Sequence, residues 1–223
     1  MKRFTRTNFL LCGIALMLAA FPVFAQKNDD AAQKIEINRQ PLKDFARVIQ
    51  DKIEKKETDF DKPFLVEMEG TITADGRFDT KTSKFTRTEG DAQMVELGKM
   101  AIQAIGEAGF FGYLKNFGID KVLFSMQQDD GNFLAVIKSE LKTPERAKTT
   151  ASGLNTMLSV IKVADREGIK KIDEASKALI NNLKVSTQEK SVIIDFSMPK
   201  ADFHELLMRE IMKSKDKNKN VQS

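Results

Sequence analysis

The feature that most constrains the fold is a strand, strand, helix pattern that occurs three times between residues 63 and 213. In the first unit, alternating apolar residues over 66–72 precede an Asp75-Gly76 turn, and the stretch up to Phe85 is predicted to return as a second strand. A helix follows, with one apolar face made by Met94, Leu97, Gly98, Ala101, Ile105 and Ala108. A two-stranded ribbon cannot bury its apolar face alone, so the pattern predicts that hairpin and helix pack together.

The second and third units repeat this order. In the second, two apolar strands in KVLFSMQQDDGNFLAVIKSEL flank Asp130-Gly131, and Thr143-Pro144 predicts the start of a helix. In the third, strands around Val185 and Ile194 precede a last helix, and IKKIDEASKALINNL before them predicts a short extra helix. Together the units predict an α+β fold, with an antiparallel or mixed sheet covered by helices on one side. Whether they form one sheet or two stays open at this point.

The rest of the chain divides by composition. Residues 26–62 are expected to form a polar segment and then an amphipathic helix, with Pro41 in its first turn. Residues 63–128 hold the first unit, and residues 129–213 hold two further units packed with it. The charged end, residues 214–223, is predicted to be disordered because it has too few apolar residues to pack.

Residues 1–25 predict a secretory signal peptide that is cleaved after Ala25, because basic residues precede an apolar run that ends in small residues. The run is shorter than the roughly 20 residues of a spanning helix and contains Pro22, which argues against an anchor. The leucine before Cys12 argues against lipidation. Since Cys12 is the only cysteine, the mature chain has no disulfide. We therefore expect a periplasmic or secreted protein that is stabilised by packing.

The charge of the chain gives no reason to expect nucleic-acid binding. The formal net charge is +4, but removal of the leader leaves 33 basic against 32 acidic side chains. There is no Trp and one Tyr. The excess of positive charge and the aromatic groups that bind nucleic acid are therefore missing.

No residue pattern predicts catalysis, a metal site or a cofactor. His204 is the only histidine and has no second histidine or mature cysteine as a co-ligand. No serine lies in a nucleophile-elbow pattern. The most clustered acids are Asp129, Asp130, Glu67 and Glu69. Paired acids in a cleft would suit an envelope hydrolase, which is a third and weaker hypothesis, but the turn and alternating positions of these acids favour solvated roles.

The stretches GTITADGRFD, GDAQMVELGKMAIQAIGEAGF and KVLFSM, in this order, resemble the TonB C-terminal domain over about residues 63–126. The matching elements are Gly70, Asp75, Gly76, Ala101-Ile102, Ala104-Ile105 and Phe110. The resemblance implies a non-enzymatic envelope protein that binds a protein or peptide partner by strand addition, with a link to TonB-dependent transport. The uncleaved anchor and Pro-rich spacer of TonB have no predicted counterpart here, so energy transduction is not predicted. The membrane is a partner only if the leader is uncleaved.

The candidate partner-binding residues lie on two predicted strands, 66–72 and 122–126, and in the aromatic stretch GFFGYLKNFGI at 109–119. They are Val66, Met68, Ile72, Phe110, Phe111, Tyr113 and Phe124. The aromatic stretch has two interpretations: a helix cap that fills the core, or an exposed loop that grips a partner. The alternative function is binding of a small molecule or lipid in a pocket between sheet and helices. Its predicted lining is Phe110, Phe111, Phe124 and Met126.

Overall fold

The strands form one continuous antiparallel sheet. A computed structural model describes residues 37–169 and 171–219. Its six-stranded sheet has the order β2-β1-β3-β4-β6-β5, and every neighbouring pair is antiparallel. The strands are β1 (Phe64–Thr71), β2 (Lys84–Gly90), β3 (Lys121–Gln128), β4 (Asn132–Glu140), β5 (Leu183–Gln188) and β6 (Ser191–Pro199). The predicted α+β class is confirmed, and the three hairpins share one sheet.

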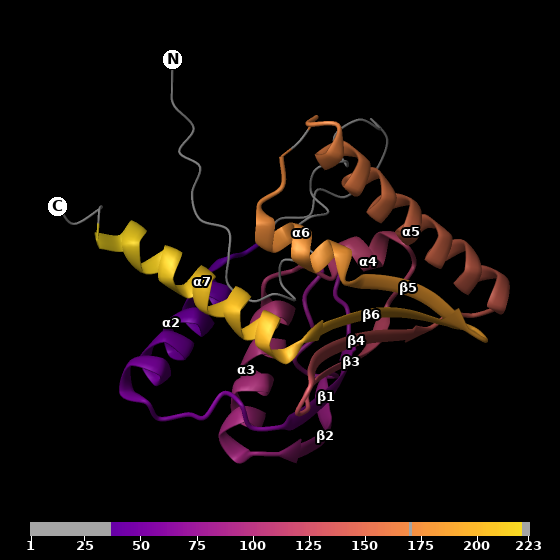
Figure 1. Cartoon of the computed structure of the whole chain (residues 1–223). Coiled ribbons are helices and arrows are strands. Elements are labelled where there is room, and N and C mark those ends of the chain that lie inside the picture. The colour runs from indigo at the N-terminus through magenta and orange to yellow at the C-terminus, as the bar shows by residue number, and fades with distance from the viewer. Residues whose placement is uncertain (1–36, 170, 220–223) are drawn as a thin grey trace.

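The helices gather on one side of this sheet (Figure 1). They are α2 (Gln40–Lys55), α3 (Ala92–Glu107), α4 (Gly112–Asn116), α5 (Pro144–Arg166), α6 (Glu174–Asn181) and α7 (Lys200–Lys219). Burial alternates along the strands: Phe64, Val66 and Met68 of β1 are buried, whereas Leu65 and Glu67 between them are only partly so. One sheet face is therefore the core face, which the helices cover, and the other is open, as predicted.

Two long strand pairings join the three hairpin units. β1 pairs with β3 from Phe64↔Gln128 to Thr71↔Lys121, and β4 pairs with β6 from Asn132↔Pro199 to Glu140↔Ser191. The hairpins β1–β2, β3–β4 and β5–β6 thus lie side by side. This arrangement leaves β2 and β5 as the two edges of the sheet.

The first hairpin is tied to α3 and α4 through Phe78. The Phe78 ring lies against Gly106 of α3, where a Cβ atom would overlap it, and stacks on Phe111 with centroids 4.3 Å apart. At the turn, Gly76 has a φ of +79° and packs on the backbone of Gly112. A side chain at Gly76 would be strained and would also collide with that backbone. Asp91 caps α3 by accepting hydrogen bonds from two backbone N–H groups of its first turn.

The return strand of the first unit starts later than the sequence predicts. After the Asp75-Gly76 turn the chain makes one isolated bridge, Ile72↔Phe78, and then turns again. Asp79 causes this second turn, because its carboxylate accepts hydrogen bonds from the Lys81 N–H (2.9 Å) and from the Thr82 hydroxyl (3.1 Å). β2 therefore begins only at Lys84 and runs to Gly90.

The C-terminal helix is longer than the sequence predicts. The last helix continues to Lys219, so residues 214–219 are helical rather than disordered. No Gly or Pro interrupts this stretch, and lysine is a good helix former. The predicted signal peptide and its cleavage site lie outside the described residues. Within 37–169 and 171–219, no helix has the length and apolar character needed to cross a membrane.

Candidate binding groove

The predicted partner-binding residues on strands are buried and belong to internal strands. Val66 and Met68 on β1, Ile72 just after it and Phe124 on β3 are at most 4% exposed. β1 lies between β2 and β3, and β3 lies between β1 and β4. The backbone of both strands is therefore paired on each side, and neither can accept a partner strand. The strand-addition site expected at 66–72 or 122–126 is placed wrongly.

The aromatic stretch is part of the core and does not form an exposed loop. Phe110, Phe111 and Tyr113 are at most 7% exposed, and burial raises the pKa of Tyr113 to about 12. Phe111 stacks on Phe78 and meets Phe124 edge to face at a centroid distance of 6.0 Å. The structure thus favours the core-filling interpretation, because these rings have no accessible face for a partner.

An apolar cavity between sheet and helices is too small for a lipid. It lies under α2, α3 and α7 and has a volume of about 70 Å³. Sites for drug-sized ligands measure about 300 to 1,000 Å³. Of the four predicted lining residues only Met126 borders it, since Phe110, Phe111 and Phe124 are packed elsewhere in the core.

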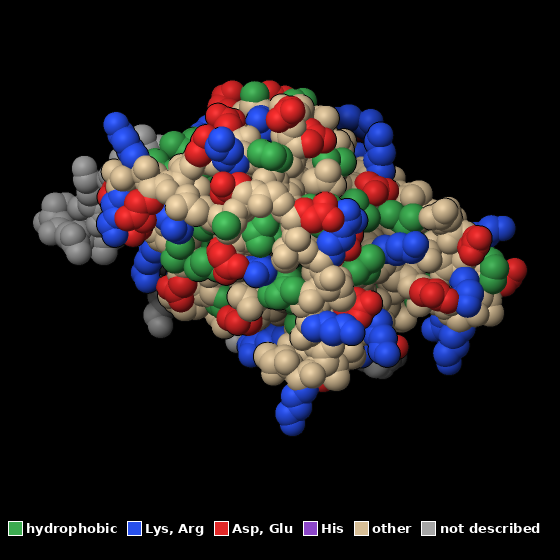
Figure 2. All heavy atoms as spheres, turned by 90° about the horizontal axis from the view of Figure 1, so that it is seen from below, with side chains coloured by type: hydrophobic (Ala, Val, Ile, Leu, Met, Phe, Trp, Pro, Cys, Tyr) green, Lys and Arg blue, Asp and Glu red, His purple; other side chains and the backbone are tan. Residues whose placement is uncertain are grey.

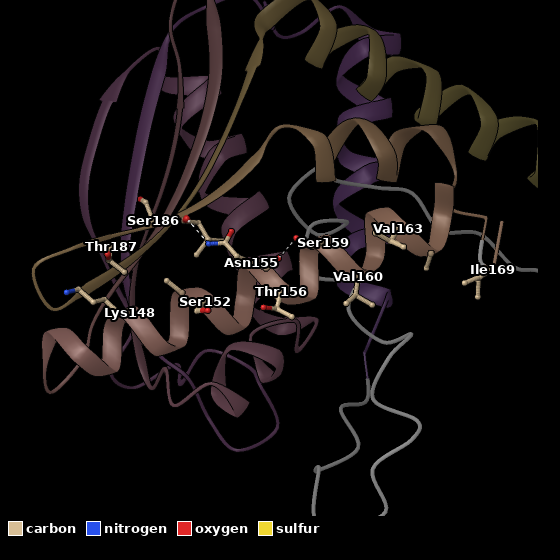
Figure 3. Close-up of a pocket in the computed structure, with 13 residues that line it drawn as sticks. Lys148, Ser152, Asn155, Thr156, Ser159, Val160, Val163, Ile169, Ser186 and Thr187 are labelled. Carbon is tan, nitrogen blue, oxygen red and sulfur yellow. Dashed lines mark hydrogen bonds between the residues drawn. The ribbon is translucent and has the colours of Figure 1, made fainter. Parts of the chain in front are cut away.

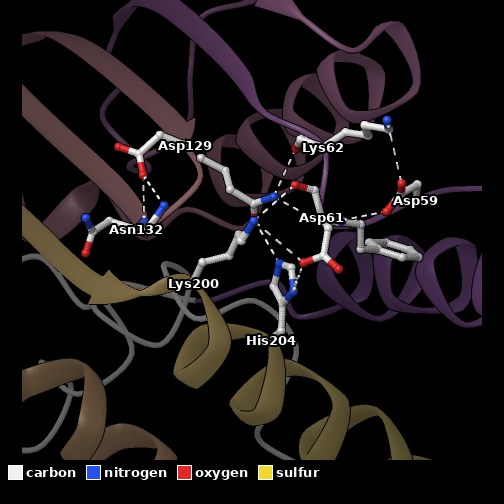
Figure 4. Close-up of polar contacts among 10 residues, drawn as sticks. Asp59, Asp61, Lys62, Asp129, Asn132, Lys200 and His204 are labelled. Carbon is white, nitrogen blue, oxygen red and sulfur yellow. Dashed lines mark hydrogen bonds and ion pairs between the residues drawn. The ribbon is translucent and has the colours of Figure 1, made fainter.

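His204 takes part in a polar cluster that ties α7 to the segment before β1 (Figure 4). The buried amide of Gln128 donates to the carbonyl groups of Phe60 (2.8 Å) and Lys62 (3.0 Å), so its oxygen is the acceptor that lies 2.8 Å from Nε2 of His204. The neutral imidazole therefore carries its proton on Nε2. Its Nδ1 lies 3.6 Å from the carboxylate of Asp61.

This cluster has the geometry of a structural contact. Burial lowers the pKa of His204, Asp61 opposes that shift, and Lys200 adds to it. Lys200 also donates to the Asp61 carbonyl at 3.2 Å. Lys200 and the Gln128 amide hold the loop before β1 in place, and the charge of Lys200 also acts on Asp129. Among the described residues, no serine is bonded to His204.

The clustered carboxylates do not converge on a cleft. Asp129 accepts hydrogen bonds from the Asn132 and Gly131 N–H groups in the β3–β4 turn, and these bonds lower its pKa. Glu69 pairs with Lys84 at 3.5 Å, and both side chains are exposed. Among residues 37–169 and 171–219, no group of three metal-ligating side chains is present. Seen from below, the surface mixes acidic, basic and apolar side chains, and no one sign of charge gathers on it (Figure 2).

The two sheet edges differ in how they are protected. β2 carries Lys84, Arg87 and Glu89, and its pairing with β1 is interrupted by a register shift. Charges and irregular pairing are common ways to prevent an edge from pairing with another strand. β5 carries one charge, Lys184, together with Val185 and small polar residues. Of the two edges, β5 is therefore the better candidate for accepting a strand.

The backbone of β5 presents hydrogen-bonding groups outward at alternate residues. The Ser197 N–H donates to the Asn182 carbonyl at 3.4 Å, which places Asn182 in an inward-facing pair with β6. In an antiparallel ladder, inward and outward residues alternate, so Val185 and Thr187 direct their N–H and C=O groups outward. Asn155 of α5 supports this assignment, because its side-chain amide donates to the Val185 carbonyl at 3.1 Å.

An open groove of about 780 Å³ runs between α5 and this edge (Figure 3). Among residues 37–169 and 171–210, four large apolar side chains are exposed, and three of them line the groove. These are Val160 (42% exposed), Val163 (44%) and Ile169 (78%). Ser152, Thr156 and Ser159 add hydroxyl groups, and Lys148 is the only charged side chain among the described lining residues. The groove thus combines apolar contact area with the outer edge of the sheet, where Asn155 bonds the Val185 carbonyl.

Sequence reasoning missed this groove, although two signals were present. The buried face of α5 contains Ala151, Leu154, Leu158 and Ile161. Val160 and Val163 are out of phase with that face, which marks them as exposed apolar residues. In addition, β5 is polar after Val185, as is typical of an edge strand.

Comparisons with known proteins add no assignment. No family model, no curated protein and no solved structure matches the chain. The resemblance of residues 63–126 to the TonB C-terminal domain therefore stays a prediction. The structure defines a two-layer α+β protein with an open groove along one sheet edge.

Proposed function

We propose that this is a non-enzymatic, exported protein that binds an extended segment of a protein or peptide partner as an additional strand at β5. The single observation that carries the proposal is the combination of an outward-facing β5 backbone with the groove along α5. Export and a location in the bacterial envelope rest on the sequence of residues 1–25. The link to TonB-dependent transport rests on the family resemblance alone.

Strand addition uses main-chain hydrogen bonds for affinity and alternate side chains for selectivity. Val185 and Thr187 offer the main-chain groups, and the alternate side chains of the partner on the core face then lie against α5. There the partner's side chains contact Val160 and Val163 and reduce the exposure of these two valines. Apolar burial of this kind stabilises the complex at about 25 cal/mol per Å².

Asn155 occupies the place that a partner strand would take at Val185. Its exposed side-chain amide donates to the Val185 carbonyl as the backbone N–H of an added strand would. Because the bond is exposed, its exchange for a partner N–H costs little free energy. The arrangement satisfies the edge while it is empty and leaves it open to exchange.

The test is a selection of displayed random dodecapeptides on the immobilised mature protein, followed by affinity measurement of the enriched peptides. The decisive variant is Thr187→Pro, which removes one outward N–H and leaves the ladder with β6 unbroken. We expect this variant to weaken binding at least tenfold, because the proline ring also keeps a partner strand from approaching.

The other edge supplies a matched control, Thr88→Pro. Since Asp91 donates from its backbone N–H to the Pro63 carbonyl, alternation directs the Thr88 N–H outward on β2. Like Thr187, Thr88 is exposed and lies opposite a buried valine, Val66. Thr88→Pro should leave binding unchanged. The proposal is contradicted if the selection enriches no peptide. It is also contradicted if both variants melt like the wild type and lose peptide binding to the same extent.

A further inference from the structure

We infer that the segment bound at β5 runs antiparallel to it, with acidic residues at its N-terminal end and apolar residues at its C-terminal end. This inference rests on the proposed strand addition and assigns the direction and chemistry of the partner. It follows from the unlike ends of the groove.

The groove has a basic, hydroxyl-rich end and an apolar end, because α5 and β5 run in opposite directions. Near its start α5 places Lys148 beside Thr187, toward the end of β5 (Figure 3). Midway, Asn155 reaches Val185. Further along α5, Val160 and Val163 lie beyond the start of β5. A bound strand therefore meets polar and apolar surroundings in a fixed order.

Charge at the first end favours an acidic partner group. Among the described lining residues, Lys148 is the only charged side chain and none is a carboxylate. The nearest acid in sequence is Glu145. The pKa of Glu145 is lowered chiefly by hydrogen bonds to its own backbone N–H and to Thr143, and the charge of Lys148 is a weaker cause. The other lysine of this edge, Lys184, lies opposite Asp195 on β6. Lys148 is thus the cation best placed to meet a carboxylate of the partner.

The pairing of the sheet favours the antiparallel direction. Every strand pair in the sheet is antiparallel. Val185 and Thr187 each present both an N–H and a C=O outward, and an antiparallel partner residue can exchange two hydrogen bonds with one such residue. An antiparallel segment enters beside Thr187 with its N-terminal end and leaves toward Val163. Its acids therefore come first and its apolar residues last.

Three synthetic peptides with blocked ends test this inference: EETVTVTVLL, its reversed sequence LLVTVTVTEE, and the charge-swapped KKTVTVTVLL. Affinities are measured at low ionic strength, because salt screens exposed ion pairs. For the wild type we expect EETVTVTVLL to bind more tightly than either of the others, by about two- to fivefold over the charge-swapped peptide. Lys148→Glu should reverse the order of the two charge forms.

The matched control is Lys43→Glu, which makes the same charge change at an exposed position of α2, outside the groove. It should leave the order unchanged. If all three peptides bind equally and Thr187→Pro abolishes this binding, the assigned direction and charge are wrong. Strand addition at β5 then still stands. Tighter binding of the reversed peptide overturns the direction. Absence of binding by every peptide overturns this inference, and strand addition falls with it only where the dodecapeptide selection also enriches no peptide.

Discussion

Truncation of Phe111 distinguishes a core role for the aromatic stretch from a partner-gripping role. Phe111 is 0% exposed and makes two aromatic contacts, a stack on Phe78 at 4.3 Å and an edge contact with Phe124 at 6.0 Å. Phe111→Ala leaves a cavity whose walls come from β3, α4 and the first hairpin. These elements cannot all move inward, so the cavity remains.

The expected cost is large on the scale of single substitutions. Replacement of a buried Phe by Ala costs about 3 to 5 kcal/mol, and complete burial with two ring contacts places Phe111→Ala near 4 kcal/mol. For a domain of this size each kcal/mol lowers the melting temperature by about 2 to 4 °C. The variant should therefore melt about 8 to 16 °C below the wild type.

Urea unfolding followed by circular dichroism measures this cost. The control is Phe85→Ala, which removes the same ring from a partly exposed position on the edge strand β2 and should cost about 1 kcal/mol. The core assignment is refuted if Phe111→Ala lowers the free energy of unfolding no more than Phe85→Ala does and also abolishes peptide binding. Peptide binding by the folded fraction of Phe111→Ala should equal that of the wild type.

Two further predictions concern a helix cap and a titration. Asp91→Ala should destabilise the protein by about 1 kcal/mol in urea unfolding, because the N–H groups of Gln93 and Met94 lose their acceptor, whereas Asp91→Asn should restore most of the loss. A cost below about 0.3 kcal/mol contradicts the capping role. In an NMR titration, the single histidine should titrate below the usual 6.5, because burial lowers its pKa. The unfolded chain then binds this proton more readily, so the contribution of His204 to stability falls as pH drops below 6.5, and His204→Gln should remove that component. A midpoint above 6.5 would show that Asp61 outweighs burial.

Much of the fold could be predicted because its signals are local. Asp130-Gly131 and Thr143-Pro144 mark a hairpin turn and a helix start by their own backbone preferences, and both features are present. Periodic apolar residues likewise predicted α2 and α6. The late start of β2 was missed because it depends on side-chain bonds of Asp79 in a second turn.

Strand order and the site were not predictable in the same way. Which strands are edges depends on pairings between residues far apart in sequence, such as Val66 with Met126. The alternating pattern of β1 fits an internal or an edge strand equally well, so the expected site fell on the wrong strand. The groove additionally needs α5 to lie beside β5, and local sequence does not fix that contact.

The unlike edges of the sheet also bear on self-association. A sheet with two free edges can add copies of itself end to end, and since the edges are different surfaces, such growth does not close and yields a filament. Here charges on β2 and the Asn155 amide over Val185 oppose that growth from opposite ends. Because the Asn155 bond is exposed and weak, the charges on β2 are the stronger obstacle, and a second copy would have to bring that charged edge against β5. Under the proposed function, β5 therefore accepts an uncharged foreign strand more readily than another copy of the protein.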